Sequence, residues 1–229
     1  MRINKYIAES GACSRREADK LIDEKRVTIN GIVCELGSTV ESGDTVCIDG
    51  TPIGTNKKNV YIALNKPVGI ECTTDSRVAE NIVDFVGHQE RVFPIGRLDK
   101  DSEGLILLTN DGDIVNKILR ADNHHEKEYI VTVNKSITPS FLEGMSKGVN
   151  ILGVKTKPCK IYPINDRTFS IILTQGLNRQ IRRMCEVFGY RVLNLKRIRI
   201  MNIKLGNLKI GHWRNVTKNE LNELMRLLK

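Results

Sequence analysis

The pattern of apolar and polar positions over the first fifty residues predicts a compact unit of two helices and short strands. We expect a helix over Ile3 to Glu9, because Gly11 suits the left-handed position after a helix end. Ser14 to Glu17 has the form of a capping box and predicts the start of a second helix. Val27 to Val33 predicts a hairpin, since the Asn30-Gly31 pair at its centre favours positive φ.

Beyond this unit, residues 50–59 lack periodicity and predict a linker. From residue 60 onward, strand patterns and helix patterns alternate irregularly, which favours an α+β fold over regular βαβ winding. The expected strands are Val60–Leu64, Leu105–Leu108, Tyr129–Val133, Ser170–Leu173 and Arg191–Met201. The expected helices are Ile114–Leu119, Pro139–Lys147, Arg179–Phe188 and Lys218–Leu228, the last opened by a capping box from Thr217 to Glu220. The predicted domains are therefore residues 1–49 and 60–229.

Length and composition are those of a globular protein with two domains, because 229 residues with 28% charged and 40% hydrophobic side chains suffice for two cores. No stretch approaches the roughly 20 apolar residues that cross a bilayer. The first residues contain no apolar signal-peptide core. We therefore expect a cytoplasmic protein that has no membrane partner and acts as a monomer.

Cysteine and histidine spacing gives little support for a metal site or for disulfides. The six cysteines contain no C-x-x-C pair, so buried free thiols are expected ahead of disulfides or zinc. His124-His125 beside Glu126 has no accompanying ligand motif, and no metal is predicted there.

Charge is concentrated near the C-terminus. The net charge is +9, but residues 1–60 carry nine basic and nine acidic side chains, and residues 61–166 carry thirteen and fifteen. Residues 167–229 carry fourteen basic side chains and three acidic ones. A solvated surface kept for solubility needs no such clustering, so this surplus favours a phosphate backbone as the partner.

Candidate chemistry lies in the segment from Gly96 to Gly104, where charged side chains precede an apolar strand. Loops held by a rigid sheet are where catalytic groups tend to lie. Asp99, Asp101 and Glu103 are therefore candidates, although solvated ion pairs with the neighbouring Arg97 would give the same pattern.

The string GRLDKDSEGLILLTNDG closely resembles the central motif of the RsuA/RluB/RluE/RluF family of pseudouridine synthases. The resemblance implies that Asp99 is the catalytic carboxylate, and that Arg97 fills the space left by a target nucleotide turned out of its stack. Asp101 and Glu103 lie outside the catalytic position and are interpreted as organising the loop or as solvated. The fold implied is a catalytic domain with a mixed, mainly antiparallel sheet.

Three further segments resemble the family in the same order. LNKPVG, with Lys66, is similar to a segment that supports the catalytic loop, and EKEY places Tyr129 against the target base. GLNRQIRRM places Arg182 as the partner of Asp99, which would lower the pKa of that carboxyl. The resemblance also implies that Lys66 and Arg97 contact the substrate, together with Asn178, Arg179, Gln180 and Arg183.

Helical geometry gives a further argument about the segment GLNRQIRRM. At 100° per residue, the apolar Ile181, Met184, Cys185 and Phe188 share one face, and Arg179, Arg182, Arg183 and Glu186 share the opposite face. Asn178 is expected to cap this helix. A stripe of guanidinium groups is better suited to phosphates and fixed carboxylates than to solubility.

The N-terminal string RINKYIAESGACSRREADKLIDEKRVTING resembles the S4 RNA-binding domain. Its basic residues lie on the two predicted helices and are candidate RNA contacts: Arg2, Lys5, Arg15, Arg16 and Lys20. An ordinary surface position remains the alternative for any single one of them. A helix N-terminus attracts phosphate as well, and Arg15 and Arg16 stand at one.

The resemblance implies isomerisation of a uridine in structured large-subunit ribosomal RNA, without cofactor or metal. YIALNKPVGIECTT and NKILRADNHHEKEYIVTV look most like the F-type branch, for which a tRNA anticodon uridine is a second candidate substrate. The B, E and small-subunit branches remain alternatives, as does a non-catalytic S4-type assembly factor. A methyltransferase is disfavoured because no G-x-G-x-x-G fingerprint is present.

Overall fold

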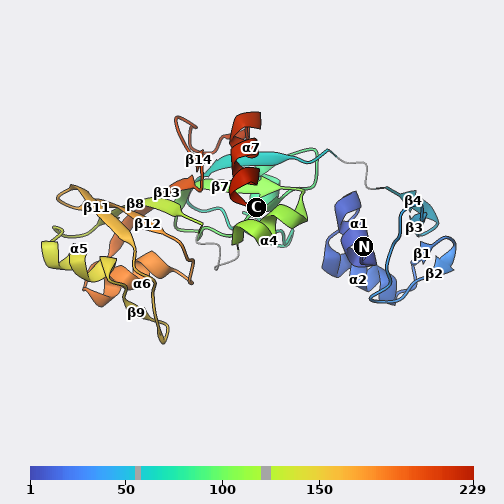
Figure 1. Ribbon diagram of the computed structural model, residues 1–229, viewed down its shortest axis with the longest axis horizontal. Coiled ribbons are helices and arrows are strands. Elements are labelled where there is room, and N and C mark those ends of the chain that lie inside the picture. Colours follow the sequence, from blue (N-terminus) through green and yellow to red (C-terminus); the bar gives the residue numbers. More distant parts are fainter. Residues whose placement is uncertain (55–57, 120–124) are drawn as a thin grey trace. The chain divides into compact units, whose positions relative to one another are not determined.

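The computed structural model describes residues 1–54, 58–119 and 125–229 and divides into two compact units. The first unit comprises Met1–Val60 with the short segments Gln89–Arg91 and Asn110–Gly112, and the second comprises the remainder (Figure 1). Each unit has its own apolar core, so the two are described separately.

The N-terminal unit packs two helices on a four-stranded sheet of order β2-β1-β3-β4. Its elements are α1 (Ile3–Ser10), α2 (Arg15–Asp23), β1 (Val27–Ile29), β2 (Ile32–Val33), β3 (Val46–Ile48) and β4 (Thr51–Ile53). The predicted helix end and capping box are confirmed: Gly11 has φ 80°, and Ser14 and Glu17 bond each other's backbone N–H groups. The predicted hairpin is confirmed too, with positive φ at Asn30 and Gly31.

The predicted linker begins too early. Residues 51–53 form β4, which pairs with β3 at the edge of the sheet. Pro52 is compatible with this edge because its missing N–H group is not needed there. Three residues are too few to show an alternating pattern, and residues 55–57 of the predicted linker lie outside the described ones.

The second unit is built on a nine-stranded mixed sheet, within the described ranges, with the main order β11-β12-β8-β13-β7-β5-β15. β7 and β13 run parallel, and the other pairings are antiparallel. The first strands and helices are β5 (Tyr61–Lys66), α3 (Ile82–Val86), β6 (Phe93–Pro94), β7 (Glu103–Thr109), α4 (Gly112–Leu119), β8 (Lys127–Val133) and α5 (Pro139–Ser146). They are followed by β9 (Asn150–Ile151), β10 (Val154–Lys155), β11 (Lys160–Asn165), β12 (Thr168–Leu173), α6 (Gln180–Val187), β13 (Val192–Ile200), β14 (Ile203–Lys204), β15 (Trp213–Asn215) and α7 (Lys218–Leu227).

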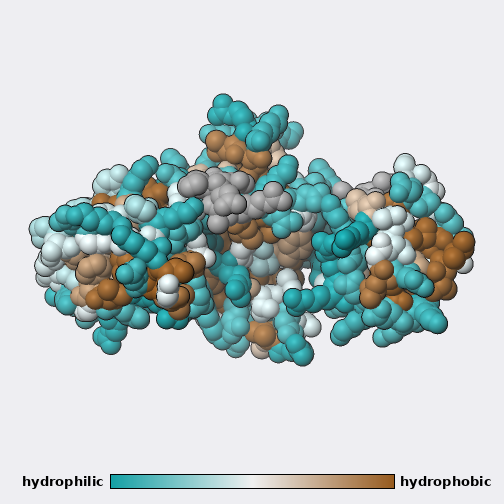
Figure 2. Space-filling view, turned by 60° about the horizontal axis from the view of Figure 1, so that its bottom comes forward, coloured by the Kyte–Doolittle hydropathy of each residue, from teal (hydrophilic) through white to brown (hydrophobic). Residues whose placement is uncertain are grey.

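Apolar burial fixes the helices on this sheet. Ile114 and Ile118 of α4 and Leu224 of α7 are buried in one cluster with residues of β5, β7 and β13. The ribbons of α4 and α7 are labelled in Figure 1. Phe141 of α5 contacts Phe169 of β12 edge to face, with ring centroids 5.6 Å apart. Polar side chains cover most of the visible surface, and apolar ones are exposed in patches between them (Figure 2). The exposed apolar residues of the first unit include Ile32 and Leu36.

The α+β prediction and the mixed, mainly antiparallel sheet are confirmed. No helix within the described segments has the length and apolar character needed to span a membrane. All six cysteines are free thiols. His124 lies outside the described residues, and His125 is buried with Nδ1 3.0 Å from the Ile118 carbonyl oxygen.

Candidate active site

Asp99 lies in the loop between β6 and β7, and contacts from several directions hold this loop. Leu98 is buried, and the backbone N–H of Ser102 donates to the Asp99 carbonyl at 3.0 Å. The backbone N–H of Gly69 donates to the Lys100 carbonyl at 2.8 Å, which joins the LNKPVG segment to the loop. The Asp99 carboxylate itself keeps 32% of its side-chain surface exposed. The loop is therefore rigid while its carboxylate stays accessible.

A cavity of about 740 Å³ opens beside Asp99 and has the size expected for a small-molecule or nucleotide site. Polar groups come from the Asp99 loop, from the turn before α6 and from β13. Apolar groups on the sheet complete the wall, among them Tyr129, Leu173 and Leu195. The cavity brings together predicted residues from three separate segments: Arg97, Asp99, Tyr129, Asn178, Arg179 and Gln180.

The cation nearest to Asp99 is Arg179, which corrects the prediction that Arg182 pairs with it. Arg179 Nη1 lies 3.9 Å from Asp99 Oδ2, and the same guanidinium makes bonds of 3.0 and 2.9 Å to the two Asp101 oxygens. Its hydrogen bonds are the main cause that lowers the pKa of Asp101. Asp101 therefore organises the loop, as expected, by fixing a guanidinium beside Asp99.

Arg182 is buried and holds the Asp99 loop by hydrogen bonds. Its Nη2 donates to the Asp101 carbonyl at 2.9 Å and to Ser102 Oγ at 3.2 Å, and its Nη1 donates to the Val192 carbonyl at 3.3 Å. Its Nε lies 3.5 Å from Asp101 Oδ2. Arg182 is not among the residues that line the cavity. The helical wheel placed Arg182 on the same face as Arg179 and could not show that its guanidinium bonds the backbone of Asp101 and of Val192 in β13.

The turn that enters α6 also differs from the prediction. The N-cap is Arg179 in the left-handed conformation with φ 50°, and not Asn178. Asn178 instead accepts bonds from Arg183 through its backbone oxygen and Oδ1, at 3.1 and 3.2 Å. Gln180 is buried, and its Oε1 accepts the Leu177 N–H at 3.0 Å. The left-handed conformation of Arg179 directs its own side chain toward Asp101. Local sequence rules do not predict this conformation.

Two predicted substrate contacts lie off the cavity surface. Lys66 is fully buried, and its ammonium donates to the carbonyls of Pro67 and Ile70, both at 2.9 Å. Burial lowers the pKa of Lys66, while the nearby carboxylates of Asp99 and Asp101 act in the opposite direction. Lys66 thus holds the LNKPVG turn, and its predicted contact with the substrate stays a prediction. Arg183 also lies outside the lining and bonds Asn178.

Tyr129 and Arg197 face each other on neighbouring central strands. Tyr129 of β8 is buried, pairs with Arg197 of β13 in register and has the Arg197 Cζ 6.0 Å from its ring centroid. Arg97 is exposed at the cavity rim. Lys127 also lines the cavity, and burial lowers its pKa.

Sequence reasoning missed Arg197 and Lys127 as cavity residues. The signal was available for Arg197, because a period of two in Leu195-Lys196-Arg197 places a cation on the same face as Leu195 in a central strand. Buried cations in a sheet are unusual and point to a functional environment.

The candidate RNA contacts of the N-terminal unit lie on its two helices, as predicted. Arg15, Arg16 and Lys20 of α2 are exposed, and Arg2 is exposed at the N-cap of α1. Lys5 is 3.5 Å from Glu9 in an ion pair. Within the part of the chain that the structure describes, no group of three or more His, Cys, Asp or Glu side chains is placed to hold a metal.

Two family models match the chain. The one described as RNA pseudouridylate synthase matches residues 60–187, and the S4 domain matches residues 1–46. An S4 domain joined to a synthase unit defines an RNA-modifying isomerase, and this chain belongs to the RNA pseudouridylate synthase family. It is a pseudouridine synthase, and RNA is its substrate.

Two similar proteins and one solved structure agree with this family. The chain is 57% identical over 229 residues to the dual-specificity RNA pseudouridine synthase RluF of Salmonella typhi, covering 99% of this chain and 79% of that protein. It is 37% identical over 236 residues to the ribosomal large subunit pseudouridine synthase B of Bacillus subtilis strain 168, with 99% and 96% covered. A crystal structure of a pseudouridylate synthase superposes with a TM-score of 0.72 at 29% identity, covering 98% of this chain and 99% of that one. The predicted family is confirmed.

Proposed function

We propose that this enzyme isomerises a specific uridine of 23S ribosomal RNA, and a tRNA anticodon uridine as a second substrate, with Asp99 as the catalytic carboxylate. The observation that carries the role of Asp99 is its place on a hydrogen-bonded loop, with a carboxylate that is partly exposed in a cavity and 3.9 Å from Arg179. The 57% identity to proteins named dual-specificity RluF supports the two substrates. We propose further that the enzyme acts as a monomer in the cytoplasm, where these RNAs are made and assembled.

The reaction breaks the C1′–N1 glycosidic bond, turns the uracil and joins C5 to C1′. The bond's electron pair leaves with the uracil as an anion. After C5 attaches, it loses its proton and N1 gains one, so the product is a neutral isomer and no other reactant is consumed. Asp99 supports the electron-deficient ribose, either through an ester to C1′ or next to a glycal formed when Tyr129 removes the C2′ proton. Both routes use the carboxylate as an anion, and the positively charged guanidinium of Arg179 lies 3.9 Å from it.

RNA binding is assigned to surfaces outside the cavity. We propose an RNA-binding domain over residues 1–53, with Arg2, Lys5, Arg15, Arg16 and Lys20 as its contacts, and a catalytic domain over residues 60–229. The target uridine must leave its stack to reach the cavity, and the exposed Arg97 at the rim is suited to take its place in the RNA.

The test is Asp99→Asn, which keeps the size of the side chain and removes its charge. Tritium release from [5-³H]uridine RNA should fall to background without added cofactor, while RNA affinity stays within about threefold of wild type, because phosphate contacts supply most of the binding energy. Activity that survives this change would overturn the assignment. Mapping pseudouridines in ribosomal RNA and tRNA from a strain that lacks the gene identifies the target positions. Loss only at a site outside 23S ribosomal RNA would point to another branch of the family.

A further inference from the structure

Arg197 is a buried arginine whose hydrogen bonding is incomplete. Its side chain lies in β13 at 3% exposure, and Nε donates to the Leu105 carbonyl at 2.7 Å. Nη1 reaches the Arg97 carbonyl at 3.5 Å, which is a long contact. Nη2 is shielded from solvent and has no hydrogen-bond partner in the described ranges of the chain. A buried donor that lacks a partner costs about 1 to 3 kcal/mol, and more when it is charged.

The charge of Arg197 is also uncompensated. Within residues 1–54, 58–119 and 125–229 it forms no ion pair, whereas Arg179 and Arg182 share Asp101. Lys66 and Lys127 lie close enough for the Arg197 charge to contribute to the lowering of their pKa values. A buried cation among other cations is unfavourable unless an anion or strong acceptor arrives with the substrate.

The position of Arg197 identifies that acceptor. It lines the cavity beside Tyr129, and Leu195 lies two residues earlier on the same strand and also lines it. An aromatic ring and a leucine form a surface for a flat base, and Arg197 Cζ lies 6.0 Å from the centroid of that ring. A phosphate would instead require exposed donors, which Arg97 and Arg179 supply at the rim.

We propose that Arg197 donates a hydrogen bond from Nη2 to a carbonyl oxygen of the target uracil and stabilises the base anion during isomerisation. When the C1′–N1 bond breaks, the electron pair leaves with the base, and the charge spreads over N1, O2 and O4. A preorganised cation at one of these oxygens stabilises the charged state more than the neutral bound uridine, so it raises kcat. This role rests on the proposed site at Asp99.

The experiment combines a change in the enzyme with a change of one substrate atom. RNA with 2-thiouridine or 4-thiouridine at the target replaces one carbonyl oxygen by sulfur, a weaker acceptor. We expect one thio substrate to slow single-turnover product formation by wild type about 10-fold. Arg197→Met should lower kcat for ordinary RNA by roughly 10- to 100-fold with little change in KM, and should bring the oxygen-to-sulfur rate ratio close to 1.

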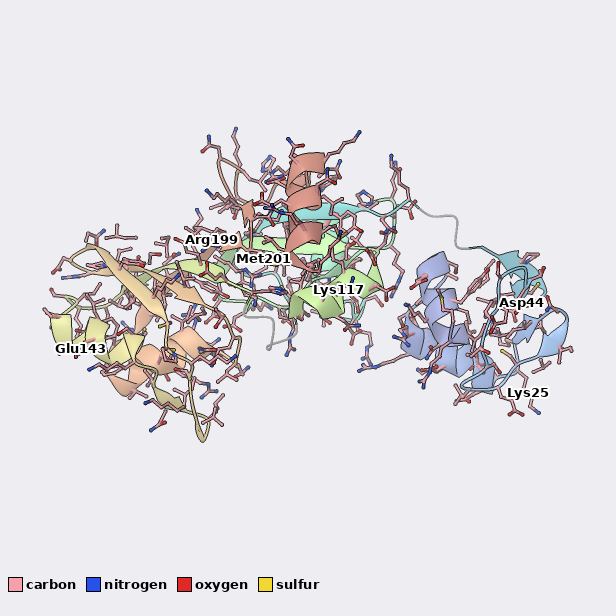
Figure 3. All side chains as sticks on the ribbon, viewed as in Figure 1. Lys25, Asp44, Lys117, Glu143, Arg199 and Met201 are labelled. Carbon is pink, nitrogen blue, oxygen red and sulfur yellow. The ribbon has the colours of Figure 1, made fainter. Side chains whose placement is uncertain are left out.

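The matched control is Arg199→Met. Arg199 lies in the same strand, close to Met201 in Figure 3, and bonds Glu128 Oε2 at 2.9 Å and Glu126 Oε2 at 3.0 Å, outside the cavity lining. This variant should keep the wild-type rate ratio for both thio substrates. A purely structural role for Arg197 would lower the rate for oxygen and sulfur substrates equally and leave the ratio unchanged.

Two further results would overturn the proposal. Wild-type rates that are equal for the uridine, 2-thiouridine and 4-thiouridine substrates exclude a bond to either oxygen, and this result requires no variant to fold. An unchanged ratio in an Arg197→Met protein that folds as wild type does would do the same, because methionine has no donor for either base oxygen. A failure of the proposed active site can be distinguished from a failure of the proposed role of Arg197, because it would leave the Asp99→Asn variant active.

Discussion

Replacing Gly104 by alanine tests the join between the catalytic loop and the sheet. Gly104 is the second residue of β7, just after the Asp99 loop, and pairs with Arg197 of β13, where the two strands run parallel. A Cβ atom at this position would lie 2.3 Å from the Arg197 carbonyl oxygen and 2.7 Å from its nitrogen. These are backbone atoms, so no side-chain rotation relieves the clash.

The expected loss in the free energy of unfolding is the sum of two contributions. Gly104 has φ +106°, a conformation that costs an L-residue about 1 to 3 kcal/mol. Separating the two strands to admit a methyl group costs about 1 to 3 kcal/mol more. The expected loss of about 4 kcal/mol is a large share of the roughly 5 to 15 kcal/mol that stabilises a typical domain.

The assay is urea unfolding followed by the fluorescence of Trp213, the only tryptophan in the chain, which lies in β15 of the same sheet. Single-turnover activity should fall as well, because the same strand pair positions Asp99 and Arg197. Gly112→Ala is the control, since Gly112 begins α4 with nothing within 4 Å of an added Cβ, and its stability should stay within about 1 kcal/mol of wild type. A Gly104→Ala protein as stable as this control would refute the reasoning.

Three further changes test other parts of the molecule. Glu220 accepts two bonds of 2.8 Å from Arg214, which hold its pKa at about 2, so its contribution is present above pH 4.5 and is lost as the pH falls toward 2. Glu220→Gln should therefore destabilise the enzyme by about 1 to 2 kcal/mol at pH 7, after allowance for solvent screening, and equal wild type near pH 2; equal thermal unfolding at pH 7 would contradict this. Arg179→Gln should raise the pKa of Asp101 toward its ordinary value, measured by carboxyl ¹³C NMR, because hydrogen bonds from Arg179 are the main cause of its lowering; an unshifted titration would show another cause. Arg16→Gln should weaken RNA binding and reduce the slope of log affinity against log salt by about 1, and an unchanged slope would remove Arg16 from the contacts.

Local signals account for the elements that were predicted correctly. The capping boxes at Ser14 and Thr217, the glycine at position 11 and the Asn-Gly hairpin act within a few residues, so the chain segment itself specifies them. The missed elements are short or irregular: α3 has five residues, β6, β9, β10 and β14 have two each, and β11 contains Pro163 at the sheet edge. The short strands among these elements form only because a partner strand supplies the hydrogen bonds.

The sequence by itself determined the family, the α+β class, the candidate Asp99 and the approximate position of Tyr129 in a central strand. Only the tertiary structure decided which cation faces Asp99. Arg179 and Arg182 are three residues apart on one segment, but Arg179 takes a left-handed conformation and turns to the loop, while β13 covers Arg182. The tertiary structure alone also placed Arg197 in the cavity with an unpaired nitrogen, because the pairing of β13 with β7 and β8 joins residues about sixty to ninety positions apart. Burial and ion pairing depend on what lies across the sheet, and a linear pattern does not contain that information.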